Sequence, residues 1–287
     1  MAFSPFAKTW GTFKPPPGCR LDRAHELSAQ LSDCLLLNEA GGTKLVNLAG
    51  ADGSLSAGSG TAGWGTTRLG PGAVIGGGGS LSLPRLGNYA GQDATIRIVH
   101  APSSWAAYTS LPDLANYSVG QGGREFSLFF DTNGNINYIG FGGNTPPLSG
   151  GGANTSMSAG GVYDFVFTRS PSSGVGTSYV NGKLMGTINA GNATTQTTTA
   201  AAIGTGDSGG GSNYNGAIVL FQGWIGRALN AAEVASLYAQ PYQMLLPAAS
   251  RYYSIPSPAA GRRFPPVGAG VLGAGPGIVL GGRAWTH

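Results

Sequence analysis

Short runs that alternate apolar and polar residues dominate the chain, and a period of two residues predicts strands rather than helices. The run 94–101, ATIRIVHA, alternates as a strand with one face against a core should. Phe126, Leu128 and Phe130 alternate in the same way within the run 125–142. Further strand-like runs are CLLL (34–37), YDFVFTR (163–169), SYVNGKLMGTI (178–188), AAIGTG (201–206) and GAIVLFQGWIG (216–226). So many short strands predict an all-β sandwich.

Turn-forming residues separate these runs and indicate where the chain reverses. Asn133-Gly134 lies inside the run 125–142, and Asn181-Gly182 lies inside the run 178–188. Asn-Gly favours the type I′ turn that joins two antiparallel strands, because both residues tolerate a positive φ. We therefore expect two hairpins here. The small residues from 51 to 63 are expected to form a loop.

One segment has the pattern of a helix. In LNAAEVASLYAQP, Asn230 precedes Glu233 by three residues, which is the spacing of a capping box. Pro241 should end the helix, because proline cannot continue the backbone hydrogen bonding. The apolar face at helical spacing consists of Val234, Leu237 and Tyr238. A series of strands with a single short helix is typical of a β-sandwich rather than of repeated β-α units.

Composition supports one large domain between two arms. Only 10% of the residues are charged and 41% are hydrophobic, and 51 of the 287 are glycine. Residues 1–19 contain a run of three prolines and little periodicity, so we expect an extended N-terminal arm. The sandwich should occupy residues 20–247. Residues 248–287, rich in glycine and proline, should form a second extended arm.

Charge distinguishes the second arm from the body. No acidic residue follows Glu233, and the basic residues that do follow it supply the whole formal net charge of +4, namely Arg251, Arg262, Arg263 and Arg283. A neutral body with a basic arm suits an arm that binds an anionic partner. The alternative is a flexible tail whose arginines only improve solubility.

Signals for disulfides, secretion and membrane insertion are missing from the sequence. Cys19 and Cys34 do not form a disulfide framework or a metal-finger spacing, so we expect two reduced thiols. The first residues, MAFSPFAKTWGTFKPPPG, contain no continuous apolar segment of a signal peptide. No stretch approaches the roughly 18 apolar residues of a membrane span. We expect synthesis in a host cytoplasm and no membrane partner.

The second half of the chain resembles laminin-G-like domains of the concanavalin A-like lectin/glucanase family. The motifs that carry the resemblance are Tyr179-Val180-Asn181-Gly182-Lys183, Ile203-Gly204, Asn215-Gly216-Ala217-Ile218 and the segment from Arg227 to Tyr238. The resemblance implies a jelly-roll sandwich of the type also found in bacteriophage structural proteins. Some family members bind calcium through loop Asp or Asn residues, for which Asp207 and Asn213 are the candidates here. The strand 219–222 lacks a carboxylate, so we predict no metal and no cofactor.

The sequence contains partial features of two catalytic alternatives, a serine protease and a glycoside hydrolase. His100, Asp113 and Ser208 occur in the order of a chymotrypsin-like triad, and Ser208 lies in GDSGG. That motif sits in a Gly/Ser/Asn-rich stretch between two strands, which favours a loop, because a triad is defined by geometry rather than letters. Glycoside hydrolysis needs two carboxylates about one glycosidic bond, and in the resembling glucanases both lie on one strand. No strand here offers such a pair, so we predict that the chain is not an enzyme.

The candidate carbohydrate-binding residues are aromatic residues in stretches of small residues, namely Trp64, Trp105, Tyr108 and Tyr117. Exposed aromatic rings can stack on sugar faces. The alternative, which we favour, is that these rings fill the sandwich or a subunit interface. Trp224 lies in an apolar strand and is expected in the core.

Two functions follow as hypotheses. The first is a structural or adhesive virion protein, a phage decoration, head-fibre or tail-associated protein. Its arms would bind other virion proteins or further copies of the chain in a homo-oligomer. The second is a lectin module that recognises a cell-surface glycan, and a glycoside hydrolase is a third alternative.

Overall fold

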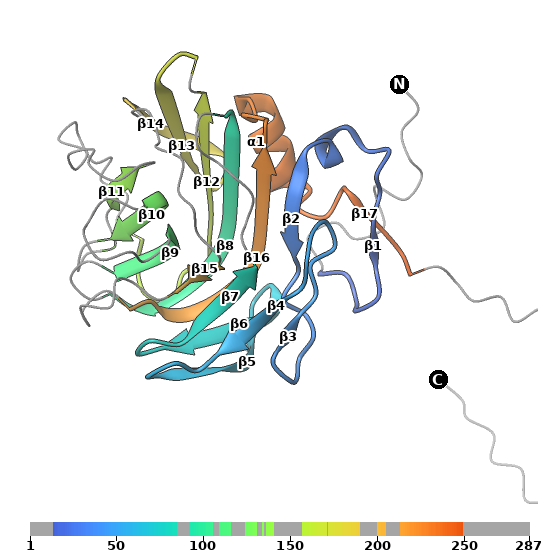
Figure 1. Ribbon diagram of the computed structural model, residues 1–287, viewed down its shortest axis with the longest axis vertical. Coiled ribbons are helices and arrows are strands. Elements are labelled where there is room, and N and C mark those ends of the chain that lie inside the picture. The colour runs from blue at the N-terminus through green and yellow to red at the C-terminus, as the bar shows by residue number, and fades with distance from the viewer. Residues whose placement is uncertain are drawn as a thin grey trace, which may run out of the picture. The chain divides into compact units, whose positions relative to one another are not determined.

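Antiparallel sheets make up nearly all of the regular structure (Figure 1). The computed structural model describes residues 14–84, 92–105, 109–115, 124–130, 134, 136–140, 157–170, 172–189, 200–204 and 213–248. Two large sheets enclose a common core, and the described part of the chain contains a single α-helix. The predicted all-β sandwich with one short helix is therefore confirmed.

The larger sheet has eight strands. Seven follow the order β14-β13-β12-β8-β16-β6-β5, and β2 pairs with β16 outside this path. Their bounds are β2 (Leu31–Leu35), β5 (Thr61–Thr67), β6 (Gly70–Gly76), β8 (Ala94–Ser104), β12 (Tyr163–Ser170), β13 (Val175–Val180), β14 (Lys183–Asn189) and β16 (Asn215–Ile225). The strands β8, β12 and β16 lie at its centre, and β8 and β12 carry three residues of the candidate site, Arg97, Val99 and Asp164.

The smaller sheet has seven strands in the order β11-β10-β9-β15-β7-β4-β3. Their bounds are β3 (Lys44–Leu45), β4 (Gly53–Ser56), β7 (Ser80–Pro84), β9 (Thr109–Ala115), β10 (Arg124–Phe130), β11 (Ile136–Gly140) and β15 (Ala200–Ile203). A third sheet pairs β1 (Arg20–Leu21) with β17 (Leu245–Leu246), so segments from near both ends of the described chain meet.

The core between the two large sheets follows from the alternation seen in the sequence. Ile98 lies opposite Phe165, and Ile96 lies opposite Phe167, so each pair meets across β8 and β12 on the inner face. All four side chains are fully buried. Burial of each such side chain stabilises the fold by about 1.5–3 kcal/mol. The smaller sheet contributes Leu55, Leu81, Leu83 and Ile203 to the same core.

The outer face of the larger sheet is covered as well. A second apolar cluster joins this face to the helix α1 (Ala231–Ala239), the short 3₁₀ helix η1 (Glu26–Ser28) and β2. Trp224 belongs to this cluster, and its Nε1 donates to the carbonyl of Leu27 at 2.7 Å, which confirms the expected core position. Because both faces of β8 are covered, Arg97 is fully buried. The expectation that only one face of this strand meets a core was wrong.

A β-bulge in β16 adapts this strand to its two cores. The register pairs Ile218 with His100 and Leu220 with Val99, which leaves Val219 as an extra residue. Val219 and Leu220 therefore both face the outer cluster, while Ile218 faces the inner core. A bulge reverses the facing of every later side chain, and strict alternation in the sequence cannot locate it.

The helix α1 begins with the predicted capping box. The side chain of Asn230 accepts from the backbone N–H of Glu233, and the Glu233 carboxylate accepts from the backbone N–H of Asn230. Val234 and Leu237 are buried as predicted, but Tyr238 is 47% exposed. Within the described residues, no helix is long and apolar enough to cross a membrane.

The predicted hairpins have different outcomes. Asn181 and Gly182 have φ of 51° and 74° between β13 and β14, as a type I′ turn requires. β10 and β11 also pair as an antiparallel hairpin, although Asn133 lies outside the described residues. The predicted loop at 51–63 is wrong, because it contains β4 and the start of β5. Their small residues lack strand propensity, and only Leu55 of β4 is buried.

A partly buried lysine anchors the described start of the chain. The Lys14 ammonium donates to three backbone carbonyls, those of Leu37 and Val219 at 2.9 and 2.8 Å and that of Pro71. Val219 is the bulged residue, so Lys14 satisfies a carbonyl at an irregularity in the β16 ladder. Burial lowers the pKa of Lys14 to about 7, against the effect of Glu39. The predicted extended arm of residues 1–19 remains a prediction.

Both cysteines are buried thiols. Cys19 and Cys34 form no disulfide and belong to the outer cluster. Burial raises the pKa of Cys19 to about 11 and that of Cys34 to about 12. The thiols are thus kept protonated, as the expectation of two reduced cysteines requires.

We predict that His100 makes the fold sensitive to acid. The imidazole is fully buried between aromatic rings, and burial lowers its pKa to about 3. The unfolded chain binds a proton near pH 6.5, so stability falls as pH drops from about 6.5 towards 3. Between pH 7 and 4.5, the wild type should lose about 2–3 kcal/mol more unfolding free energy than His100→Phe, measured by urea denaturation.

A control is available in His25, which is only partly buried and whose pKa is also lowered by burial. His25→Asn should change the pH dependence of the unfolding free energy less than His100→Phe does. Equal pH slopes for the wild type and His100→Phe would contradict the account, because they would show that the folded protein carries a protonated His100.

Candidate functional site

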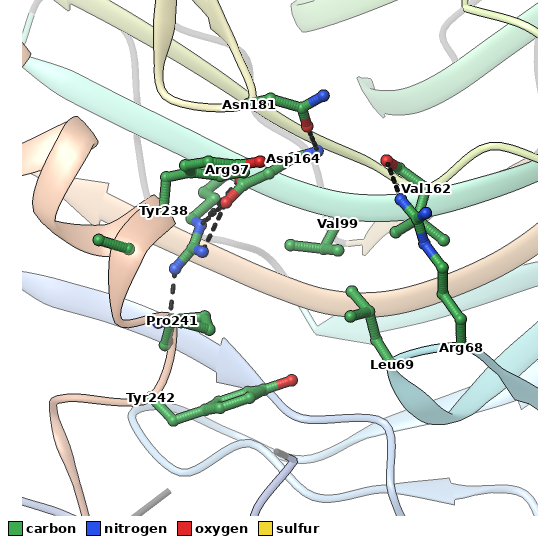
Figure 2. Close-up of a pocket in the computed structure, with 11 residues that line it drawn as sticks. Arg68, Leu69, Arg97, Val99, Val162, Asp164, Asn181, Tyr238, Pro241 and Tyr242 are labelled. Atoms are coloured by element: carbon green, nitrogen blue, oxygen red, sulfur yellow. Dashed lines mark hydrogen bonds and ion pairs between the residues drawn. The ribbon is translucent and has the colours of Figure 1, made fainter. Parts of the chain in front are cut away.

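A pocket of about 340 Å³ opens on the outer face of the larger sheet, beside the end of α1 (Figure 2). Its volume lies in the range of small-ligand sites. The lining comes from the turn between β5 and β6, from β8, from the start of β12 and the residue before it, from the β13–β14 corner, and from the end of α1 and the segment that follows it. The lining residues are Arg68, Leu69, Arg97, Val99, Val162, Asp164, Asn181, Tyr238, Ala239, Pro241 and Tyr242.

The floor of the pocket is a buried ion pair between Arg97 and Asp164. The Arg97 Nη2 lies 2.6 Å from Asp164 Oδ2, and Arg97 Nε lies 3.0 Å from Asp164 Oδ1. The two residues sit on neighbouring strands, where Arg97 pairs with Val166 and Asp164 pairs with Val99. They are therefore diagonal neighbours on one sheet face, within reach of long side chains.

The same arginine holds the end of α1. Arg97 Nη2 donates to the carbonyl of Leu237 at 3.0 Å, and Nη1 donates to Gln222 Oε1 at 2.9 Å and to the carbonyl of Pro241 at 3.5 Å. The last carbonyls of a helix have no partners within the helix, and a cation there is favourable. No basic residue of α1 itself lies in its last turn. Arg97 supplies this charge from the sheet.

The β13–β14 corner closes a second side of the pocket. Asn181 Oδ1 accepts from the backbone N–H of Asp164 at 3.0 Å, and the N–H of Asn181 donates to the carbonyl of Asp164 at 2.8 Å. A Cβ on Gly182 would lie 2.9 Å from Cβ of Tyr238. Glycine at this position thus allows the corner to approach the helix, and Asn181 is held at the pocket wall.

Three side chains complete the rim. Arg68 is exposed and its Nη2 donates to the carbonyl of Val162 at 3.2 Å. Tyr238 presents a half-exposed ring, while Tyr242 is only 4% exposed. Burial raises the pKa of Tyr242 to about 12, so its hydroxyl remains protonated at neutral pH. Figure 2 shows Arg68 and the two tyrosines on different sides of the pocket.

Of the predicted carbohydrate-binding residues, the two that the structure describes, Trp64 and Trp105, do not line this pocket. Trp64 and Trp105 are partly buried and pack against the inner core. Their indole Nε1 groups donate to the carbonyls of Gly42 and Met157. Tyr108 and Tyr117 lie outside the described residues. Sugar binding by these four aromatic residues stays a prediction.

Other predicted residues are placed only in part. Asp207, Ser208 and the arm residues Arg251, Arg262, Arg263 and Arg283 lie outside the described residues. Among the residues that are described, no three His, Cys, Asp or Glu side chains come together as a metal site would need. Calcium binding through Asp207 and Asn213 is therefore untested.

The residues that line the pocket were not predicted as site residues, although the sequence contains a signal for two of them. Arg97 is the one Asp, Glu, Lys or Arg residue in the run ATIRIVHA, and Asp164 is the one acidic residue in the run YDFVFTR. Buried charges are almost always paired, so such charges in central strands indicate each other. The runs ATIRIVHA and YDFVFTR carried this signal. Arg68, Asn181 and Tyr242 had no comparable one.

The sandwich and its helix define a β-sandwich class, and a family comparison gives the narrower assignment. The family described as the concanavalin A-like lectin/glucanases superfamily matches residues 76–235, more than half of the chain. The chain therefore belongs to this superfamily. Arg68, Tyr238 and Tyr242 lie outside the matched span. No curated protein matches the chain.

Solved structures with similar folds include three different proteins. A mutant of Trypanosoma rangeli sialidase displaying trans-sialidase activity matches with a TM-score of 0.56 and 17% identity, over 76% of this chain and 34% of that one. Domain 4 of AbnA, a GH43 extracellular arabinanase from Geobacillus stearothermophilus, in complex with arabinotriose, matches with a TM-score of 0.52 and 17% identity. The match covers 74% of this chain and 98% of that domain. The binding domain of Paraclostridial Mosquitocidal Protein 1 matches with a TM-score of 0.52 and 16% identity. The match covers 74% of this chain and 52% of that one.

The match to the sialidase spans about a third of the length of that chain. At identities below a fifth, these likenesses establish the fold alone. The prediction that the chain is not an enzyme is corrected at the level of the fold, because the similar structures come from a sialidase and a GH43 arabinanase. The fold is hydrolase-related. Against a glycoside hydrolase, the prediction relied on the lack of a carboxylate pair on one strand, whereas the residues of a site can come from several strands.

We predict that the floor of the pocket is essential for stability. Arg97→Met should lower the unfolding free energy by about 3–5 kcal/mol, because it leaves Asp164 as an unpaired buried charge. Arg97→Met combined with Asp164→Leu should recover much of this loss, because no charge is then left buried. Urea denaturation measures both.

The exposed ion pair between Lys44 and Asp52 is the control, with a distance of 2.7 Å between Nζ and Oδ2. Lys44→Ala should leave the unfolding free energy unchanged, because water screens the attraction between exposed charges. A loss for Arg97→Met no larger than that for Lys44→Ala would contradict a structural role of the buried pair.

Proposed function

We propose that this domain binds carbohydrate in the pocket beside α1. The observation that carries the proposal is the half-exposed ring of Tyr238 next to polar groups on a rigid floor. Aromatic rings stack on the apolar faces of sugars, and nearby polar groups bond their hydroxyls. The lining combines both kinds of group in a volume of about 340 Å³.

The rigid floor suits selective binding. The Arg97–Asp164 pair, Asn181 and the end of α1 are linked by hydrogen bonds, so the pocket wall is set before a ligand arrives. A preorganised site loses less conformational entropy when it binds. This favours a binding pocket over a gap left by imperfect packing.

The superfamily and two similar structures support the same proposal. The domain of the GH43 arabinanase was solved in complex with arabinotriose. The match covers 98% of that domain and 74% of this chain. The similar domain of the mosquitocidal protein is described as a binding domain. These relations make glycan binding a natural function for the fold, and the pocket gives it a location on this chain.

The finer role that we propose is on a virus particle, as a phage decoration, head-fibre or tail-associated protein. It is supported by the sequence resemblance and by the basic segment after residue 248. In this role, the arms would bind other virion proteins or further copies of the chain, and the pocket would bind a glycan. Retention of the full chain on purified particles, and its loss when residues 248–287 are deleted, tests this role.

We predict that Tyr238→Ala weakens glycan binding and leaves the fold intact. The ring is half exposed, so its loss should cost little stability but about 1–3 kcal/mol of binding free energy. The measurement is binding of the full chain to a broad glycan panel, followed by titration calorimetry with the best ligand.

Trp64→Phe is the matched control, because it changes the predicted aromatic site but keeps an apolar ring against the core. It should bind as the wild type does. Loss of binding in Trp64→Phe with full binding in Tyr238→Ala would contradict the pocket and favour the residues predicted from the sequence. If the folded wild type binds no glycan of the panel, this result would contradict glycan binding itself.

A further inference from the structure

The acceptors on the floor and wall of the pocket already accept hydrogen bonds from the protein. The Asp164 carboxylate accepts three hydrogen bonds from Arg97, two to Oδ2 and one to Oδ1. Asn181 Oδ1 accepts from the backbone of Asp164. The carbonyls of Leu237 and Pro241 also accept from Arg97. The fixed acceptors of the floor and the wall are therefore already engaged.

Donors, in contrast, remain. Arg68 carries five N–H groups and uses one nitrogen on the carbonyl of Val162. The Tyr242 hydroxyl has no hydrogen-bond partner among the described residues and lines the pocket. Asn181 holds the floor through its oxygen, which leaves its NH₂ group as a donor. A ligand that matches this lining must bring acceptors.

The charge of the pocket favours the same kind of ligand. Arg97 is neutralised by Asp164 at the floor. Arg68 stands at the rim, and no carboxylate within the described part of the chain pairs with it. The lining therefore carries one uncompensated positive charge, on a group whose planar fork fits a carboxylate or a sulfate in two-point contact.

We propose that the pocket selects glycans that carry an anionic group, and that Arg68 is the residue that recognises this group. The inference rests on the proposed function and names the ligand class of the same site. The acid group accepts from Arg68, the sugar ring lies against Tyr238, and Tyr242 and Asn181 donate to the remaining oxygens. A carboxylate and a sulfate share this chemistry.

The test compares charged and neutral forms of the same sugars. The probes are short uronic-acid and sialic-acid oligosaccharides, their carboxyl-reduced neutral counterparts, and sulfated oligosaccharides of neutral sugars. Binding to the full chain is measured at about 0.15 M salt, where contacts between exposed charges more than about 8 Å apart are largely screened. The carboxylated and sulfated arms distinguish the two sources of negative charge.

Arg68→Gln is the test variant and Arg23→Gln its matched control. Arg23 is also an exposed arginine that donates to backbone carbonyls, those of Leu48 and Ala49, and it does not line the pocket. Both variants remove one positive charge from the chain. Arg68→Gln should weaken binding of the charged probe about tenfold, as expected for the loss of a charge-assisted hydrogen bond, and Arg23→Gln should leave it unchanged.

Three results separate the possibilities. Preference for a carboxylated or sulfated probe, lost in Arg68→Gln alone, supports the inference. Equal binding of charged and neutral forms, or equal losses in the two variants, overturns it. The proposed function survives that result if Tyr238→Ala still weakens binding by the predicted amount. Failure of every charged and neutral probe to bind the folded chain overturns both.

Discussion

The buried ion pair between Arg97 and Asp164 links the parts of the structure that form the site. It joins β8 to β12 across the outer face of the sheet, and the same guanidinium holds the end of α1 by donating to the carbonyls of Leu237 and Pro241. The helix can therefore cover an outer sheet face that includes a charged residue. The cover ends where the ion pair lies, and the pocket opens there. Fold and candidate site thus depend on one interaction.

The ion pair also determines what the pocket offers to a ligand. A buried pair contributes little net stability, because desolvation of both charges opposes their attraction, but it fixes its neighbours in place. Here it engages Asp164, the one carboxylate among the described lining residues, and the carbonyls of Leu237 in α1 and of Pro241 after it. The groups left for a ligand include the donors of Arg68, Asn181 and Tyr242. Arg68, at the rim, keeps a charge that no described carboxylate neutralises. The ligand class follows from this balance.

Much of the fold could be predicted from local patterns, but the site could not. The turn at Asn181-Gly182 and the capping box at Asn230 depend on neighbouring residues only, and both are confirmed. The bulge at Val219 and the covering of both faces of β8 depend on distant segments, which periodicity does not record. For the same reason Tyr238 was assigned to the buried helix face. Its ring instead lies beside the hairpin corner and the pocket, because β13 and β14 approach the helix there.

The central claim is that glycan binds beside α1 rather than at the tryptophans near the inner core. The most direct measurement is NMR of the ¹⁵N-labelled full chain during titration with the best glycan of the panel, observing side-chain N–H signals. The account predicts shifts of the Asn181 amide and the Arg68 guanidinium, with the indole signals of Trp64 and Trp105 unchanged. Shifts of either indole with unchanged Asn181 and Arg68 signals would contradict it.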